Sequence, residues 1–247
     1  MGGALAEGLA RSGSDAPLCL TVTARTQATL DRLAGGVSGL NVSRDNACAA
    51  RQAHIIILAV KPWQIEEVIA QIKPVLQGQI LCSVAAGIGV RQLAAWSGLA
   101  DVFYCMPNIA ARCGQSMTFV APAPQASPAS CEAVRALFAR VGQVHVCEER
   151  LLAPGMMMSG CGIAYAMRYL RAQTEAGVEL GFRPDDALHI AMQTMQGAVS
   201  LLRHTGLHPE AAIDQVTTPG GTTIKGLNAL DHAGFNSAVI RSLKAGL

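Results

Sequence analysis

The sequence of 247 residues predicts an α/β protein in two parts: a domain with a doubly wound sheet at residues 1–147, and an all-helical domain at residues 148–247. Short β-branched runs alternate with helical patterns from residue 3 to about residue 147, which is the rhythm of βαβ units. From Glu149 onward no convincing strand pattern is found, and apolar residues recur at helical spacing.

The composition excludes several classes of protein. Hydrophobic residues make up 51% of the chain and aromatic residues 4%, which suits helices packed closely on a sheet. The 19 basic and 17 acidic residues give a net charge of +2, so there is no strong electrostatic case for a nucleic-acid or membrane-surface partner. The longest plain apolar run, Ile55–Val60, is far too short to span a bilayer, and no charged-then-apolar leader precedes it. The eight cysteines form no CxxC pair or metal-ligand block, so we expect reduced thiols, no metal and a cytoplasmic location.

The elements of the first part follow from local patterns. A helix is expected over Gly3–Arg11, ended by Gly13, and it opens the chain with no strand before it. The clearest strand is His54–Val60, a continuous apolar run with β-branched residues that Lys61-Pro62 stops. Further strands are expected at Leu18–Thr23, Ile80–Val84, Asp101–Met106, Met117–Val120 and Val144–Cys147. Further helices are expected at Ala28–Leu33, Ile65–Leu76, Val90–Ala95 and Ser130–Arg140.

In the second part, two apolar stripes with helical spacing are separated by Pro184. The first stripe consists of Ile163, Met167, Leu170, Thr174, Val178 and Phe182. The second consists of Leu188, Met192, Met195, Val199 and Leu202. Pro209, Pro219 and Gly234 then punctuate three shorter helices, so this part is predicted to be helical throughout.

The opening MGGALAEGL looks like the second half of a G-x-G-x-x-G fingerprint, with Gly2 or Gly3 as its last glycine. In that device the backbone N–H groups at a helix start bind a pyrophosphate. The strand and the first two glycines are not seen, so the first strand of the sheet is expected to be missing. Taken alone, the pattern fits a glycine-rich helix start better.

Three other segments lie at expected strand ends. Arg25 follows the strand in TVTART, where no acidic residue stands, and an Arg at that place accommodates the 2′-phosphate of NADP. The alternative is a solvated surface Arg. The turns Ala59–Pro62 and Val84–Gly87 carry small residues that would let a flat cofactor approach the backbone. Ordinary turn chemistry explains each of them equally simply.

The segment TTPGGTTIKGL at residues 217–227 predicts an exposed helix start after two glycines. The N–H groups and dipole of that helix, together with two Thr hydroxyls, could hold a small anion such as a carboxylate. A helix start that is merely capped remains an equal alternative. No GxSxG elbow, HExxH pair or P-loop occurs in the chain. The pair His204 and His208 has no nearby partner ligand, and Cys161 fits packing better than nucleophilic catalysis.

Together these segments resemble the pyrroline-5-carboxylate reductase family. The matching segments run in order through nearly the whole chain: MGGALAEGL, ILAVKPW, SVAAGI, MPN, SGCGIAYAMRYLRAQTEAGVELGF and VTTPGGTTIKGL. The last is the most specific. The resemblance implies a Rossmann-type domain followed by a helical domain through which a homodimer forms and often assembles further. It also implies hydride transfer from NADPH or NADH to the C=N carbon of 1-pyrroline-5-carboxylate, giving L-proline in the last step of proline biosynthesis.

The predicted site combines these patterns with the resemblance. The cofactor-binding residues expected are Gly2, Gly3, Arg25, Asn46, Ala59, Val60, Lys61, Pro62, Val84, Ala85 and Ala86. The substrate-binding residues expected are Gly220, Gly221, Thr222 and Thr223. The resemblance implies that Asn46 contacts the cofactor, that the N–H groups around Gly221–Thr223 take the substrate carboxylate, and that Thr223 is the catalytic residue, bonded to the ring nitrogen.

The chain departs from the family pattern at Ile109-Ala110, where Thr-Pro is common, and at Cys161 and Ile163, where Ser and Pro are common. These changes bear on loop geometry more than on chemistry. Two alternatives to an active reductase of this substrate stay open. One is a related Rossmann reductase acting on another small acid or imine. The other is a non-catalytic oligomerising relic whose cofactor site is impaired by the absent strand and glycines.

Overall fold

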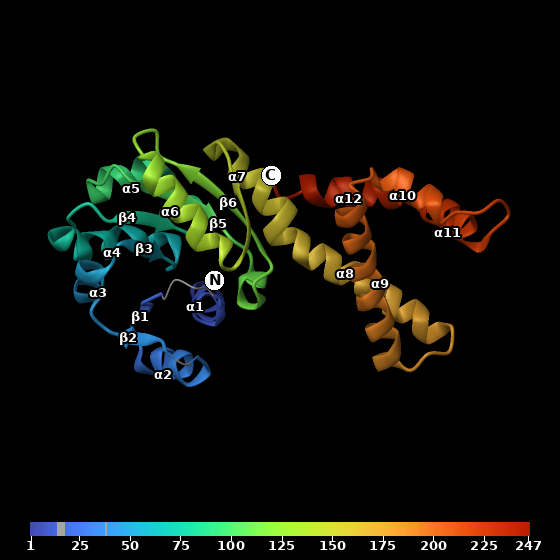
Figure 1. Ribbon diagram of the computed structural model, residues 1–247, viewed down its shortest axis with the longest axis horizontal. Coiled ribbons are helices and arrows are strands. Elements are labelled where there is room, and N and C mark those ends of the chain that lie inside the picture. Colours follow the sequence, from blue (N-terminus) through green and yellow to red (C-terminus); the bar gives the residue numbers. More distant parts are fainter. Residues whose placement is uncertain (14–17, 38) are drawn as a thin grey trace. The chain divides into compact units, whose positions relative to one another are not determined.

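The computed structural model describes residues 1–13, 18–37 and 39–247 (Figure 1). The chain divides into two compact units, Met1–Gly160 and Cys161–Leu247. The residues between 148 and 160 belong to the first unit because Leu152 is buried in its core and Gly155 lies against the ring of Phe119.

The first unit alternates strands and helices, as the sequence predicts. Its strands are β1 (Thr21–Thr23), β2 (Asn41–Ser43), β3 (Ile55–Leu58), β4 (Ile80–Ser83), β5 (Val102–Met106), β6 (Ser116–Pro122) and β7 (Gly142–Val146). Its helices are α1 (Gly2–Arg11), α2 (Gln27–Gly36), α3 (Asn46–Gln52), α4 (Ile65–Ile72), α5 (Val90–Ser97), α6 (Pro128–Ala139) and α7 (Leu152–Met156). Short 3₁₀ turns are η1 (Pro62–Gln64), η2 (Lys73–Val75), η3 (Ile109–Cys113) and η4 (Glu149–Leu151). The patterns did not predict β2 or α3.

The main sheet has the strand order β3-β4-β5-β6-β7. Strands β3, β4 and β5 are parallel, and β7 is parallel to β6. One connection departs from the predicted βαβ pattern, because β6 runs antiparallel to β5. Only the short segment around η3 joins these two strands, and a parallel crossover needs a dozen or more residues.

Strands β1 and β2 pair in parallel as a separate two-stranded sheet. Within the described ranges, no strand pairs with β3 on the side away from β4.

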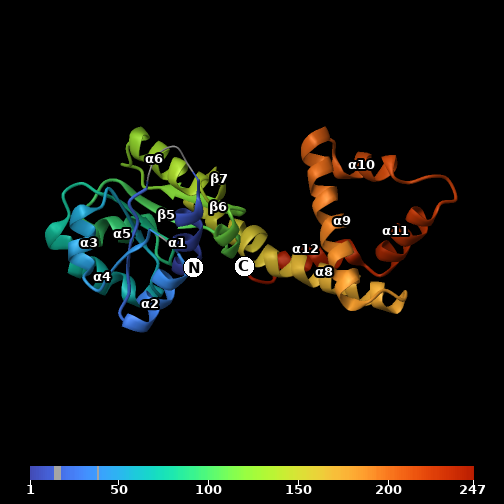
Figure 2. The ribbon, with the colours of Figure 1, turned by 60° about the horizontal axis from the view of Figure 1, so that its bottom comes forward.

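Helices cover both faces of the main sheet (Figure 2). On one face, α4, α5 and α7 pack on β4 and β5 through Ile69, Leu93 and Leu152, which are almost completely buried. On the other face, α1 and α6 contribute Leu9 and Phe138 to a second apolar cluster. This two-sided burial explains why the strands read as continuous apolar runs.

The second unit is helical throughout its length, as predicted. It contains α8 (Gly162–Glu179), α9 (Pro184–Thr205), α10 (Pro209–Gln215), α11 (Thr222–His232) and α12 (Phe235–Lys244). A π-helical turn at Met157–Cys161 precedes α8, and the sequence did not predict it. No helix in the described part of the chain is long and apolar enough to cross a membrane.

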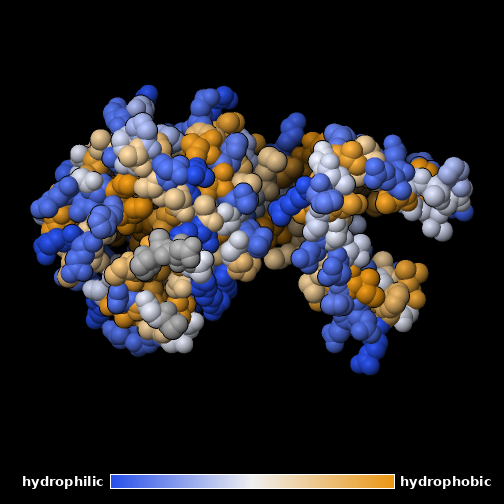
Figure 3. Space-filling model, in the orientation of Figure 1, coloured by the Kyte–Doolittle hydropathy of each residue, from blue (hydrophilic) through white to orange (hydrophobic). Residues whose placement is uncertain are grey.

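The apolar stripes of the second unit are largely exposed in the single chain. Thr174 on α8 and Ala187 on α9 are buried where the two helices pack, and Gly177 lies directly against Ala187. By contrast, Met167 is 60% exposed and Phe182 is 52% exposed. Patches of apolar side chains therefore reach the surface of this unit (Figure 3). The stripes predicted from the sequence are real helix faces, but most of their length is not core of the single chain.

Candidate active site

Helix α1 presents its amino terminus at the end of β3. The helix starts after Met1, has no side-chain cap and carries no acidic residue in its first turn, so its first N–H groups are available to an anion. A Cβ atom placed on Gly2 would lie 3.0 Å from the Cβ of Ala59. The structure thus brings Gly2 and Ala59 together, whereas Gly3 faces Leu33 of α2.

Helix α1 is fixed in this position by the segment after β5. Glu7 forms an ion pair with Arg112, with Oε2 and Nε 2.8 Å apart. Gly8 packs so closely on the carbonyl group of Ala111 that a Cβ atom there would collide with it. These contacts tie the helix that carries Gly2 to η3.

Arg25 lies just after β1 and is exposed, and the structure links it to the turn after β3. In the side-chain orientation that satisfies its hydrogen bonds, the Gln64 amide oxygen accepts from both terminal nitrogens of Arg25, at 3.1 Å from Nη1. Arg44 donates from Nη2 to the carbonyl oxygen of Arg25 at 3.2 Å. The Arg25 guanidinium therefore lies beside the turn after β3, the Arg44 guanidinium lies beside the Arg25 backbone, and either group could approach a phosphate.

Asn46 is the first residue of α3, and its amide nitrogen donates to Oε1 of Gln71 on α4 at 2.7 Å. Its predicted contact with a cofactor stays a prediction. Lys61 lies exposed in the turn after β3, and Val60 is 37% exposed.

The two predicted turns leave the main sheet side by side. The N–H of Val84 donates to the carbonyl oxygen of Leu58 at 3.0 Å, at the carboxyl ends of the parallel strands β3 and β4. The turns Ala59–Pro62 and Val84–Ala86 therefore share one edge, the edge at which open α/β sheets bind their ligands. Ala85 is buried, which anchors the second turn in the core.

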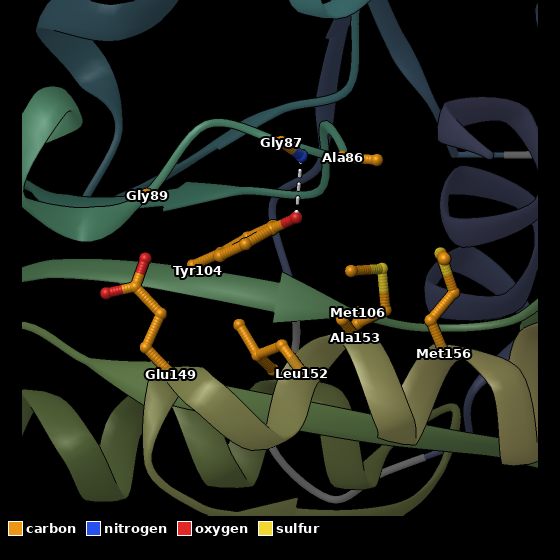
Figure 4. A pocket seen from close by; sticks show the side chains of 9 residues that line it. All are labelled: Ala86, Gly87, Gly89, Tyr104, Met106, Glu149, Leu152, Ala153 and Met156. Atoms are coloured by element: carbon orange, nitrogen blue, oxygen red, sulfur yellow. Dashed lines mark hydrogen bonds between the residues drawn. The ribbon is translucent and has the colours of Figure 1, made fainter. Parts of the chain in front are cut away.

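A cavity of about 320 Å³ lies beside the second turn (Figure 4). It is lined by Ala86, Gly87, Gly89, Tyr104, Met106, Glu149, Leu152, Ala153 and Met156. The hydroxyl of Tyr104 accepts a hydrogen bond from the N–H of Gly87 at 2.9 Å. Oε1 of Glu149 accepts from the N–H of Val90 at 3.1 Å. The sequence patterns did not predict Tyr104 or Glu149 as site residues. The only signal for Tyr104 is its place two residues before Met106, on the same face of β5.

The ionisation of Tyr104 follows from its surroundings. Burial raises the pKa of the Tyr104 phenol above its ordinary value, and the nearby Glu149 carboxylate raises it further. The hydrogen bond from the Gly87 N–H acts in the opposite direction but is outweighed. The phenol is therefore protonated at neutral pH and acts as a neutral acceptor toward the turn.

Asn108 of the MPN segment and Ser159 of the SGCG segment meet within the first unit. Asn108 is buried and donates from Nδ2 to the carbonyl oxygen of Ser159 at 3.4 Å. Its Oδ1 accepts from the N–H of Ala110 at 3.0 Å, so the departure at Ile109-Ala110 supplies a backbone donor for the cap of η3 that a proline at this position would lack. The buried Oγ of Ser159 has no hydrogen-bond partner within the described residues. An orphaned hydroxyl beside a π-helical turn is a feature that often accompanies a ligand site.

In the second unit, the TTPGGTT segment forms a turn followed by a helix start. The N–H of Gly221 donates to the carbonyl oxygen of Thr218 at 3.0 Å, and Gly220 has a φ of 70°, which requires glycine in this type of turn. Helix α11 begins at Thr222 without a side-chain cap or an acidic residue in its first turn. Thr222 and Thr223 are exposed. The structure brings the four predicted substrate residues together within the second unit, and the predicted cofactor residues lie in the first.

The first unit fits a dinucleotide. An uncapped helix start lies against Ala59, two small-residue turns share one sheet edge, and Arg25 lies beside the first of these turns. The fold and this site define an NAD(P)-dependent oxidoreductase with a helical second domain. Residues 1–87 match a family model described as NADP oxidoreductase, coenzyme F420-dependent. Residues 149–247 match one described as pyrroline-5-carboxylate reductase dimerisation. The chain belongs to the pyrroline-5-carboxylate reductase family.

Relatives with that name match nearly the whole chain. Pyrroline-5-carboxylate reductase of Pisum sativum is 32% identical, over 99% of this chain and 89% of its own length. That of Methanosarcina acetivorans is 33% identical, over 98% and 92%. Pyrroline-5-carboxylate reductase 1 of Dictyostelium discoideum is 34% identical over 98% of this chain, which spans only 46% of that protein.

Solved structures of the family have the same fold. The Plasmodium falciparum pyrroline carboxylate reductase with NADP bound is 26% identical, with a TM-score of 0.87 over 100% of this chain and 91% of that chain. The Coxiella burnetii pyrroline-5-carboxylate reductase is 27% identical, with a TM-score of 0.88 over 98% and 91%. None of these matches favours the alternative of a non-catalytic relic.

Proposed function

We propose that this protein reduces 1-pyrroline-5-carboxylate to L-proline with NADPH or NADH. The observation that carries the proposal is that relatives named for this activity match 98–99% of the chain, in both units. In the balanced reaction, hydride is added to the C=N carbon, a proton reaches the ring nitrogen, and the dinucleotide is oxidised.

The residues of the first unit would hold the dinucleotide. The free N–H groups at Gly2 and Gly3 suit its pyrophosphate, and the guanidinium of Arg25 suits a 2′-phosphate. The turns Ala59–Pro62 and Val84–Ala86 suit a flat group at the sheet edge. When bound, the reduced nicotinamide supplies the hydride.

The residues of the second unit would hold the substrate. The uncapped N–H groups from Gly221 to Thr223 suit its carboxylate. The Thr223 hydroxyl is a donor for the ring nitrogen and passes the proton directly or through water. No strong acid is required if the imine enters protonated, so catalysis rests on positioning the C=N carbon.

We further propose a homodimer through the second unit and a cytoplasmic location. The large exposed apolar side chains of α8 and α9, such as Met167 and Met192, support the dimer, because extended apolar surfaces of this kind are typical of protein–protein interfaces. The eight cysteines are free thiols, which suits a reducing compartment.

The test is NADPH oxidation by the purified chain with 1-pyrroline-5-carboxylate, with chiral analysis of the product. We expect turnover and L-proline. Faster turnover on another cyclic imine would move the assignment to a related reductase. Tight NADPH binding without turnover on any imine would reject the reaction, and no binding at all would favour the relic.

A further inference from the structure

We propose that Tyr104 and Glu149 are positioning residues that clamp the loop of residues 84–90 in the conformation that accepts the dinucleotide. This inference rests on the proposed function, in which that loop lines the cofactor. Neither residue was predicted as a site residue, and each reaches the loop from a different element (Figure 4).

Tyr104 holds the middle of the loop from below. It lies on β5 directly opposite Ser83, the last residue of β4. Its side chain therefore starts beside the point where the chain leaves β4 and enters the loop. Its hydroxyl accepts from the N–H of Gly87 at 2.9 Å. Gly87 has a φ of 85°, a conformation that L side chains rarely adopt, so the peptide direction at this point is specific. Because Tyr104 is only 7% exposed, its ring is fixed by packing and offers a rigid acceptor.

Glu149 holds the far end of the loop. Helix α5 begins after Gly89, which has no side chain to cap it. Oε1 of Glu149 accepts from the N–H of Val90 at 3.1 Å and replaces the missing cap, where a carboxylate also interacts favourably with the helix dipole. A Cβ atom at Gly89 would collide with that same oxygen, so glycine makes room for it.

The loop is therefore tied at two points, with the cavity of about 320 Å³ between it and α7. Its start is held by the core, since the N–H of Ala85 donates to Oγ of Ser83 at 3.3 Å. Ala86 is exposed and lies between the Ser83 contact at Ala85 and the Tyr104 contact at Gly87, at the sheet edge that would face the dinucleotide. Loss of either tie leaves the turn free to adopt other conformations. Because a smaller fraction of the protein then has the binding conformation, the apparent affinity for NADPH falls.

The experiment measures NADPH affinity by titration without substrate, together with kcat, KM and thermal unfolding. Tyr104→Phe should raise the Kd and KM for NADPH about fivefold, which corresponds to the loss of one ordinary hydrogen bond. It should change kcat by less than about twofold. Glu149→Ala should raise the Kd similarly, and Glu149→Gln, which keeps an acceptor oxygen, should restore most of the affinity. Matched controls are Tyr169→Phe, at a ring that packs edge-to-face against Phe235 in the second unit, and Glu132→Gln, at an exposed carboxylate paired with Arg135.

The outcomes separate the clamp from the reaction. Wild-type Kd values in Tyr104→Phe and in Glu149→Ala overturn the clamp, even if the chain reduces 1-pyrroline-5-carboxylate. If Tyr104→Phe does not fold, the comparison of Glu149→Ala with Glu149→Gln still decides, because equal affinities of these two variants overturn the role of the Glu149 oxygen. If NADPH binding weakens as expected in the two variants but the wild-type chain turns over no imine, the clamp is supported and the proposed reaction is rejected.

Discussion

Replacing Gly8 by alanine should displace the amino-terminal helix and weaken both the fold and the cofactor site. In a helix interior, Gly→Ala normally stabilises by up to about 1 kcal/mol. At Gly8 the new Cβ would collide with the carbonyl oxygen of Ala111 and lie 3.1 Å from Cγ1 of Val141. A backbone carbonyl cannot swing aside, so overpacking of about 1–3 kcal/mol should exceed the helix gain.

We expect a net loss of about 1 kcal/mol in the free energy of unfolding, which for a protein of this size lowers Tm by roughly 2–4 °C. Because α1 must move, its amino terminus at Gly2 should shift from Ala59, and NADPH should bind more weakly. Urea and thermal unfolding, with NADPH titration of the folded variant, measure both effects.

The matched control is Gly35→Ala in α2, where a Cβ would meet nothing within 4 Å. It should be neutral or slightly stabilising and leave NADPH affinity unchanged. If Gly8→Ala were as stable as this control and bound NADPH normally, the inferred packing of α1 on η3 would be refuted.

Three further predictions concern single residues. Thr223→Ala should lower kcat about 100-fold with NADPH affinity nearly unchanged, and lost NADPH binding would show that Thr223 is misplaced in the scheme. Arg25→Ala should weaken NADPH about 10- to 100-fold and NADH hardly at all, and equal effects in titrations would exclude the 2′-phosphate role. Although burial opposes the shift, hydrogen bonds from Ser127 and Ser130 lower the pKa of Asp101 below its ordinary value of 3.8. Asp101→Asn should therefore cost about 1 kcal/mol of stability at neutral pH, a difference that urea unfolding should show disappearing as the pH falls below 3.8.

The main strands could be predicted because each is a continuous apolar run. Residues such as Leu58 and Leu81 are buried in the core beneath the covering helices, so a continuous run of such residues reveals the strand. Strand β2 was missed because Asn41–Ser43 is short and mostly exposed, with no burial pattern to detect. The antiparallel turn from β5 to β6 was missed because direction depends on the length of the connection, not on the strand sequence.

The candidate site could be predicted wherever its chemistry is local. Glycines at a helix start, or threonines after Pro219-Gly220, form short motifs of adjacent residues, and such motifs indicate a binding site directly. The tie between Tyr104 and Gly87 joins residues 17 apart in sequence, and that between Glu149 and Val90 joins residues 59 apart. Neither side chain has a distinctive neighbourhood in the sequence, so no local pattern points to it.

By itself, the sequence determined the order of elements, the family, and the segments expected to carry the chemistry, because backbone propensity, apolar periodicity and short motifs are properties of adjacent residues. Only the tertiary structure decided that β6 runs antiparallel to β5, that Gly2 lies against Ala59, and that Tyr104 and Glu149 form hydrogen bonds with the loop of residues 84–90. Those facts depend on distances between remote residues, which are set when the layers pack and the sheet aligns its strand ends.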